Sequence, residues 1–141
     1  MTLYYLATPY SKYPAGTEAA FYDASILAGR LMQRGVFVYS PIVHTHPIAV
    51  NNRMDLKDLS IWLPFDELIM AKLDAMIVAH MTGWEESRGI AHEIEFFEKA
   101  KKPIYDLDPQ MLTMTLRRVV DVAALSEYVE PARRHYGDIP K

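Results

Sequence analysis

The sequence predicts a single α/β domain, residues 1–141, in which helices cover both faces of a parallel sheet of four to five strands. Short apolar runs alternate along the chain with longer stretches whose apolar residues recur at helical spacing. This alternation is typical of parallel sheets, because each helix carries the chain back to the start of the next strand. A length of 141 residues, with 50% hydrophobic and 23% charged residues, suits one globular domain.

Four apolar runs are predicted as strands, and each is short enough to cross a sheet once. The first two end at Thr8-Pro9 and Ser40-Pro41, which are turn-forming pairs. The predicted strands cover residues 3–7, 36–39, 75–79 and 103–107.

Helices are expected between and after these strands. Pro64 is expected to interrupt or restart the second helix, because proline is tolerated in a first helical turn. Residues 42–52 have weak periodicity and are predicted to form a functional loop with room for one helical turn. The predicted helices cover residues 17–35, 56–72, 87–100 and about 109–128.

Composition excludes several classes of function. The chain has no cysteine, so disulfides and thiolate metal sites are impossible. Its net charge of −3, without a long basic run, argues against polymeric nucleic acid as a partner. No apolar stretch reaches the roughly 20 residues that span a bilayer, and the N-terminus lacks the pattern of a signal peptide. We therefore expect a cytoplasmic protein with no membrane partner.

Polar side chains gather in the loops that follow the first three predicted strands. The carboxyl ends of parallel strands meet at one edge of a sheet, where open α/β proteins bind ligands. We expect a ligand crevice there, with Asp66 entering from the preceding helix. The other candidates are Thr8, Tyr10, Ser11, His44, His46, Asn51, Asn52, Ser87 and Glu93.

The start of the helix at residue 87 is the sharpest of these signals. Ser87 is a good N-cap and a donor to a phosphate or hydroxyl, and Gly89 lets a ligand approach the helix closely. Glu93 follows one turn after Gly89 on the same face. A solvent-facing Glu93 beside an ordinary helix start fits the same residues, and the composition alone favours that simpler interpretation.

Asp66 and Glu93 together suggest glycosidic chemistry. One carboxylate attacks an anomeric carbon while a carboxylic acid protonates the leaving group. Apolar neighbours of Asp66 would raise its pKa as an acid requires. The alternative is that Asp66 only favours the N-terminal end of its helix.

His44 and His46 invite a metal interpretation, because residues two apart on an extended loop face the same way. No His-Glu-X-X-His pattern supports it, so hydrogen bonding within the crevice is the favoured role. His92 is expected on another side of its helix, in a structural role. Trp84 is expected either to stack on a base or to pack over the edge of the sheet.

The pattern formed by Asp74, Ser87-X-Gly89-X-X-X-Glu93 and Lys102-Pro103-Ile104 resembles the nucleoside 2-deoxyribosyltransferase superfamily. Tyr4-Tyr5-Leu6-Ala7 and Asp66, eight residues before Asp74, fit it as well. The closer likeness is to the branch that hydrolyses 2′-deoxynucleoside 5′-monophosphates. The resemblance covers roughly the first 107 residues.

This resemblance implies a flavodoxin-like three-layer fold and specific roles for three residues. Glu93 would be the nucleophile, Asp66 the general acid or the group that activates the base or water, and Tyr5 the residue that orients Glu93, with Tyr4 as the alternative. Ser87 stands where deoxyribosyltransferases often carry an aspartate and the monophosphate hydrolases a serine, which favours a nucleotide.

The chain departs from the hydrolase pattern in two places. Thr8-Pro9 replaces a Gly-Ser pair after the first strand, and Ala91 replaces a second glycine. Ser11 and Lys12 are the substitutes available for the phosphate loop. The His44-X-His46 loop belongs to neither characterised branch.

The function expected from the sequence is therefore an N-glycosidase or deoxyribosyltransferase acting on a nucleoside or nucleotide, without metal or organic cofactor. Thr8, Tyr10, Ser11, His44, His46, Trp84, Ser87 and Gly89 are the expected substrate-binding residues. A nucleotide-binding sensor of the same fold and a histidine-based metal hydrolase are the alternatives. We also expect a homo-oligomer, dimer or higher, with Met111, Leu112, Leu116, Val119 and Val120 as its candidate interface.

Overall fold

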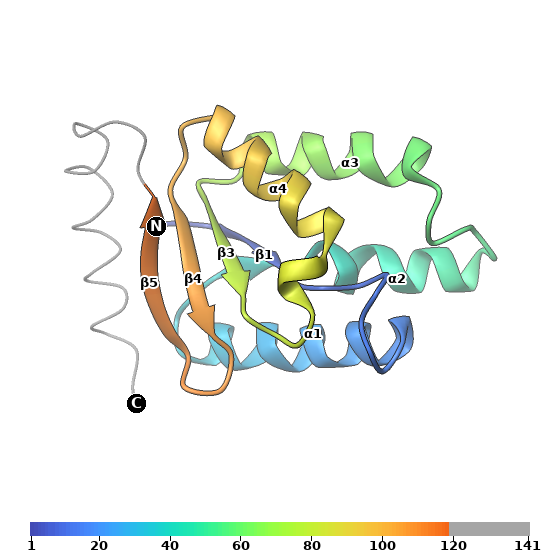
Figure 1. Ribbon diagram of the computed structural model, residues 1–141, viewed down its shortest axis with the longest axis horizontal. Coiled ribbons are helices and arrows are strands. Elements are labelled where there is room, and N and C mark those ends of the chain that lie inside the picture. Colours follow the sequence, from blue (N-terminus) through green and yellow to red (C-terminus); the bar gives the residue numbers. More distant parts are fainter. Residues whose placement is uncertain (119–141) are drawn as a thin grey trace.

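A five-stranded, mostly parallel sheet forms the centre of the computed structural model, which describes residues 1–118 (Figure 1). The strand order is β2-β1-β3-β4-β5. Strands β1 to β4 pair in parallel, whereas β5 pairs antiparallel with β4. The strands are β1 (Tyr4–Ala7), β2 (Val38–Tyr39), β3 (Ala75–Ala79), β4 (Ile104–Asp108) and β5 (Thr113–Arg118).

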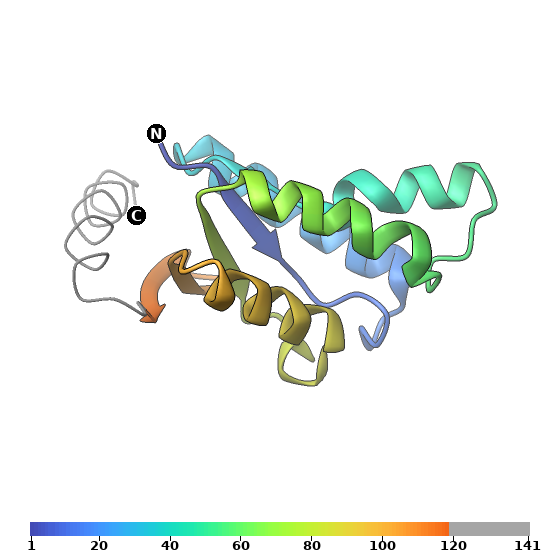
Figure 2. The ribbon, with the colours of Figure 1, turned by 90° about the horizontal axis from the view of Figure 1, so that it is seen from above.

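Helices cover both faces of this sheet. Helix α1 lies on one side of the sheet and helices α3 and α4 lie on the other (Figures 1 and 2). Leu27 and Leu31 of α1 pack on the first face, and Met70 of α3 with Ile90 and Phe97 of α4 pack on the second. The predicted three-layer α/β fold is therefore confirmed, with the strand order of flavodoxin-like proteins. The helices are α1 (Thr17–Gln33), α2 (Pro41–Asn51), α3 (Leu59–Lys72) and α4 (Arg88–Lys99), with a 3₁₀ turn, η1 (Trp84–Glu86), before α4.

Strand β1 is buried on both faces and divides the core in two. Tyr4 and Leu6 point toward α1, and Tyr5 and Ala7 point toward α3 and α4, because successive side chains of a strand alternate between faces. This alternation directs the Tyr5 side chain, which is fully buried, toward the layer that carries Asp66 and Glu93.

Residues 42–52 are not the predicted loop, because Pro41–Asn51 form helix α2. Ser40 caps this helix by accepting a hydrogen bond from the Val43 N–H, and Pro41 occupies the first turn, where a missing N–H costs nothing. Pro47 inside the helix and apolar residues around much of its circumference hid the period from the sequence pattern.

Pro64 does not interrupt its helix, so the predicted break was wrong. Helix α3 begins after the N-cap Asp58, whose carboxylate accepts a hydrogen bond from the Ser60 N–H, and runs through Pro64 to Lys72. Pro64 and Ser60 are both exposed, so water can satisfy the Ser60 carbonyl that Pro64 leaves without a donor.

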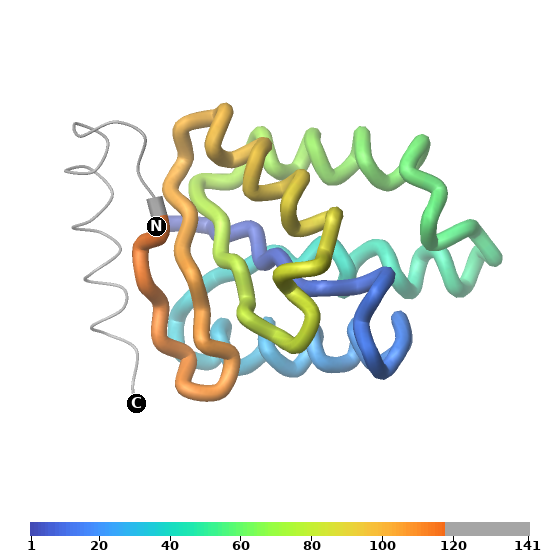
Figure 3. The backbone as a smooth tube through the Cα atoms, viewed as in Figure 1, coloured from blue at the N-terminus to red at the C-terminus, as the bar shows by residue number. Residues whose placement is uncertain are grey.

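The helix predicted from residue 109 is wrong over the described residues. Asp108 accepts hydrogen bonds from the Gln110 and Met111 N–H groups and turns the chain, which returns along β4 as strand β5 (Figure 3). Met114 and Leu116, two residues apart, pack against the core, as the period of a strand requires. The remainder of the predicted helix, including Val119 and Val120, lies outside the described residues.

Lys102 holds the end of α3 against the turn that leads into β4. Its Nζ donates to the carbonyls of Met70, Ala71 and Leu73 at 3.2, 2.9 and 2.7 Å. A cation at this position satisfies orphan carbonyls and complements the helix dipole. Lys102 therefore fixes the helix that carries Asp66 relative to the one that carries Glu93.

We expect Lys102→Met to lower the free energy of unfolding by about 2 kcal/mol, because three carbonyls lose a charged donor and the hydrogen bonds to two of them, Met70 and Leu73, are half-buried. Urea denaturation measures this change. Lys101→Met is the matched control, since the Lys101 side chain is exposed and holds none of these carbonyls. Equal loss in the two variants would contradict the assigned role of Lys102.

Candidate functional site

Four side chains from four different elements form a cluster between the sheet and helices α3 and α4. Tyr5 of β1 donates its hydroxyl hydrogen to Oε2 of Glu93 on α4. Asp66 of α3 and Tyr39 of β2 lie close enough to alter the ionisation of the Tyr5 hydroxyl. We call Tyr5, Tyr39, Asp66 and Glu93 the carboxyl cluster. The structure thus brings together the three residues to which the sequence assigned catalytic roles.

The two carboxyl groups of this cluster are both shifted toward their protonated forms. Burial raises the pKa of Glu93 to about 8, with the Tyr5 hydrogen bond lowering it and the Asp66 charge raising it. Burial also raises the pKa of Asp66 to about 6, against a lowering effect of His92. Near neutral pH the pair therefore holds about one proton, mostly on Glu93.

Tyr39 is the member of this cluster that sequence reasoning missed. Its ring lies 6.2 Å from the Tyr5 ring, and its hydroxyl is buried without a hydrogen-bond partner among the described residues. Burial, with the nearby Asp66 charge, raises its pKa to about 12. The available signal was its position at the end of the second strand, immediately before Ser40-Pro41, at the ligand-binding edge of the sheet.

The start of α4 matches its sequence prediction. Ser87 is the N-cap and accepts a hydrogen bond from the Ile90 N–H at 3.2 Å. Gly89 is exposed, and a Cβ added there would meet only Ser87 Oγ, at 3.8 Å. Packing within the described residues therefore does not require a glycine at this position, which leaves approach of a ligand as a reason for it.

The loop after β1 is fastened to α1 and α2. The Tyr10 hydroxyl lies 2.5 Å from Nδ1 of His46, and Nε2 of His46 lies 2.8 Å from Oε2 of Glu18. His46 is buried and stacks on Phe21, so both of its ring nitrogens are already engaged. Tyr10 and His46, both expected to bind substrate, thus contact each other and fasten the loop to the helices.

Thr8 and Ser11 lie in the same loop in different environments. Thr8 is buried, and its Oγ1 has no hydrogen-bond partner among the described residues. Ser11 is exposed, in the turn that follows Tyr10.

His44 and His46 do not face the same way, because helix α2 separates side chains two apart by more than half a turn. His44 stacks on Phe65 of α3 at 5.5 Å between ring centroids and lies 6.0 Å from the Tyr39 ring. The pairing that motivated a metal interpretation is therefore absent. Among residues 1–118, no group of three or more histidine or acidic side chains is placed to hold a metal ion.

His92 faces helix α3. Its Nε2 lies 3.2 Å from Oε1 of Glu67, and its charge lowers the pKa of Asp66. This contact joins α3 and α4 on the residues adjacent to Asp66 and Glu93. His92 is therefore closer to the carboxyl cluster than the sequence suggested.

Trp84 packs at the edge of the sheet. Its ring stacks on His80 at 4.1 Å and lies 5.4 Å from the Arg117 guanidinium carbon. Both of these neighbours bind Asp106, with His80 Nε2 at 2.7 Å and Arg117 at 2.7 and 2.9 Å. Of the two roles open from the sequence, the structure favours packing.

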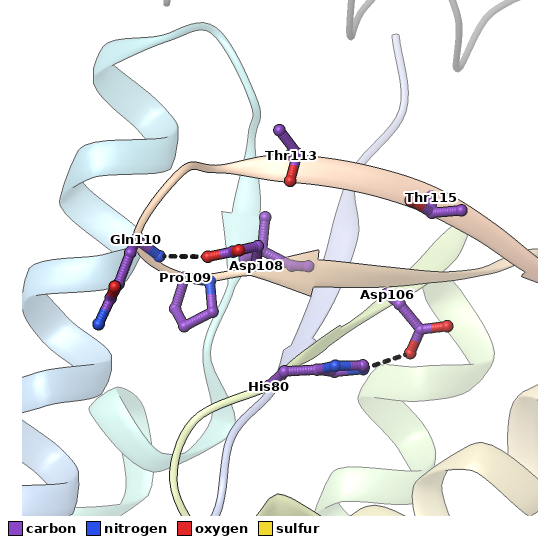
Figure 4. A pocket seen from close by; sticks show the side chains of 8 residues that line it. His80, Asp106, Asp108, Pro109, Gln110, Thr113 and Thr115 are labelled. Carbon is purple, nitrogen blue, oxygen red and sulfur yellow. Dashed lines mark hydrogen bonds and ion pairs between the residues drawn. The ribbon is translucent and has the colours of Figure 1, made fainter.

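A polar cavity of about 340 Å³ lies beside this network, separate from the carboxyl cluster. His80 enters it from the end of β3, and the β4–β5 hairpin supplies most of the other walls (Figure 4). Asp106 is neutralised there by Arg117, and Asp108 is held in the hairpin turn. No member of the carboxyl cluster lines this cavity.

A family model described as a domain of unknown function (DUF1937) matches residues 2–108. The chain belongs to the DUF1937 family. The match contains the whole carboxyl cluster and ends at the last residue of β4, so strand β5 lies beyond it. A comparison with curated proteins gives no significant match. No helix within residues 1–118 of this DUF1937 protein is long and apolar enough to cross a membrane.

We expect Glu93→Gln to become more stable relative to the natural protein as pH rises from 5 to 9. A carboxyl group whose pKa is about 8 when folded and about 4.5 when unfolded stabilises the fold fully below pH 4.5 and loses that contribution as pH rises toward 8. Glutamine keeps an acceptor for Tyr5 and does not ionise. The difference in melting temperature should grow by on the order of 10–20 °C.

Glu95→Gln is the control for this measurement. Glu95 is exposed on the same helix, and its pKa is lowered by Lys99, so its effect on melting temperature should stay constant over this pH range. A pH-independent difference for Glu93→Gln would mean that Glu93 is ionised throughout.

Proposed function

We propose that this DUF1937 protein cleaves the bond between base and sugar in a nucleoside or nucleoside 5′-monophosphate, as an N-glycosidase or deoxyribosyltransferase. The observation that carries this proposal is the partly buried Glu93 carboxyl group, which Tyr5 orients from the centre of the sheet and which lies near the Asp66 carboxyl. Two neighbouring carboxyl groups that together hold about one proton near neutral pH can supply the nucleophile and the acid that retaining glycosidic chemistry requires. The sequence resemblance to the nucleoside 2-deoxyribosyltransferase superfamily supports the same assignment.

In the proposed reaction, the Glu93 carboxylate attacks the anomeric carbon as the bond from that carbon to the base nitrogen breaks. Asp66 gives its proton to the departing base, and a glycosyl ester of Glu93 forms. Water or a second base then attacks the same carbon, loses a proton to Asp66 and releases Glu93. Tyr5 stays protonated, because burial and the Glu93 charge hold its pKa well above the usual range.

The reactive protonation state is a minority form of the free protein. The pair needs an ionised Glu93 and a protonated Asp66, whereas the pKa values of about 8 and about 6 place the proton mainly on Glu93. The proton must therefore move from Glu93 to Asp66 before the attack. The number of protons is the same in both forms, so the reaction needs no net uptake or loss from solvent.

A phosphate on the substrate would lie at the N-terminus of α4. Ser87 offers a neutral hydroxyl there, and backbone N–H groups of the first turn favour an anion. Such a substrate belongs to nucleotide metabolism and fits the cytoplasmic location expected from the sequence.

We further propose that the chain forms a homo-oligomer through α3. This 14-residue helix is rich in apolar residues, yet Met70 is the one residue of it that is buried. Leu59, Ile61 and Leu68 are each between 46% and 68% exposed. Of the interface residues expected from the sequence, Leu112 is buried in this chain's own core and Leu116 packs against it, while Met111 is exposed.

The proposed activity is tested with a panel of ribo- and deoxyribonucleosides and their 5′-monophosphates, with and without a second free base. Chromatography should detect a released or exchanged base, and Glu93→Ala should lower the rate by ~10³-fold or more. Glu95→Ala is the control and should leave the rate unchanged, because Glu95 lies on the same helix but is exposed and outside the carboxyl cluster. If the natural protein binds a panel member without releasing base, it is a sensor; if release survives Glu93→Ala, the nucleophile is wrongly assigned.

Gly89→Ala should raise stability and lower activity at the same time. Alanine stabilises an exposed helical position by up to about 1 kcal/mol, and the added Cβ meets no close neighbour in the protein. A ligand lying against the first turn of α4 would collide with that Cβ, so KM should rise by about tenfold. Urea denaturation and steady-state kinetics check the two parts, and an unchanged KM would place the ligand away from Gly89.

A further inference from the structure

Two buried polar atoms of the carboxyl cluster have no hydrogen-bond partner among the described residues. They are the Tyr39 hydroxyl oxygen and Oδ1 of Asp66. Leaving such an atom unpaired costs about 1–3 kcal/mol, and in native proteins a buried polar atom without a protein partner is normally matched by a water, an ion or a ligand. The two atoms come from different elements, β2 and α3, so they do not belong to one turn or cap.

The two atoms are complementary in their hydrogen bonding but do not bond to each other. The Tyr39 hydroxyl remains a donor at all ordinary pH values, since its pKa is about 12. An ionised Asp66 is an acceptor only. A ligand ammonium or amide N–H can only donate and a ligand carbonyl can only accept, whereas a hydroxyl accepts from Tyr39 and donates to Asp66 with the same oxygen.

The position of Tyr39 indicates that the ligand hydroxyl belongs to a sugar ring. The Tyr39 ring packs 6.2 Å from the Tyr5 ring, and the Tyr5 hydroxyl holds Glu93. A sugar whose anomeric carbon faces Glu93 carries its hydroxyls on the ring carbons that follow, so these groups extend from Glu93 toward its neighbours. The aromatic contacts of His44 with Tyr39 and Phe65 join β2 to the helix segment that carries Asp66.

We propose that Tyr39 and Asp66 together bind one ring hydroxyl of the substrate's furanose, so that Tyr39 is a specificity-determining residue for the sugar. This inference rests on the proposed function for its choice of ligand, but it makes a separate claim about Tyr39. Oδ1 of Asp66 accepts from the sugar, which leaves the other carboxyl oxygen for proton transfer to the base. A substrate without that hydroxyl would leave both protein atoms unpaired in the complex.

The test compares four sugars on the same base: adenosine, 2′-deoxyadenosine, 3′-deoxyadenosine and 2′,3′-dideoxyadenosine, or the same series on the base that the natural protein releases. The natural protein should prefer at least one hydroxyl-bearing sugar over the dideoxy compound by about tenfold or more in kcat/KM. Tyr39→Phe should lose that preference while handling the dideoxy compound as well as the natural protein does.

Tyr22→Phe is the matched control, because Tyr22 is 63% exposed on α1, on the opposite face of the sheet. Tyr39→Phe should melt no lower than the natural protein without ligand, since it removes a buried hydroxyl that has no partner. A lower melting temperature, with an equal fall in kcat/KM for all four compounds, would show that a water joins Tyr39 to Asp66 and that the role of Tyr39 is structural. That result would overturn the proposal. Unchanged discrimination in Tyr39→Phe would overturn it as well.

Failure of the proposed function leaves a different result. If the natural protein releases no base from any of the four compounds, calorimetric binding of the same four compounds replaces kcat/KM. The sugar site would be supported, without catalysis, if the natural protein binds the dideoxy compound more weakly than the hydroxyl-bearing compounds and Tyr39→Phe binds all of them equally. Equal binding of all four, or no binding of any of them, would overturn the sugar site.

Discussion

The burial of β1 on both faces is the constraint on which the rest of this structure depends. The strand lies between β2 and β3, and its four residues are at most 1% exposed. A strand buried in this way must send alternate side chains into two separate cores. Tyr5 therefore projects into the layer of α3 and α4, where its buried hydroxyl needs a hydrogen-bond partner. Glu93 supplies that partner.

The carboxyl cluster follows from this constraint at a cost to the fold. Burial keeps the Glu93 and Asp66 carboxyl groups from ionising at their usual pH, and three buried polar atoms, on Thr8, Tyr39 and Asp66, lack partners among the described residues. Elsewhere the described chain satisfies comparable groups closely, as Lys102 does with three carbonyls and Asp106 with His80 and Arg117. Two of these atoms, on Tyr39 and Asp66, belong to one cluster, and such a pair within an otherwise well-paired structure is typical of a site arranged for a ligand.

Membership of the DUF1937 family tells which proteins this chain is related to, whereas the carboxyl cluster tells which chemistry it can perform. The family match covers residues 2–108 and carries no activity with it, while the cluster supplies chemistry without a substrate. The polar cavity between His80 and the β4–β5 hairpin includes residues beyond the matched segment, since Gln110, Thr113 and Thr115 line it. All four residues of the carboxyl cluster, by contrast, lie within the matched segment.

The sequence alone determined the elements in which local pattern and packing agree. Strands β1 and β3 are continuous apolar runs, and α4 has a clear N-cap at Ser87 and a strongly amphipathic pattern, so each was predicted nearly to its ends. Glu93 and Asp66 were candidates from their positions at the predicted crevice, and the resemblance to a known family strengthened them, whereas Tyr5 was selected through that resemblance alone. Tertiary structure decided the rest, because the deciding contacts are distant in sequence. Pro47 obscured α2, and the apolar residues after Asp108 fitted a helix as well as a strand until the open edge of β4 provided a partner. The placement of Tyr39 beside Tyr5 likewise required the pairing of β2 with β1, and no spacing along the chain encodes that neighbourhood.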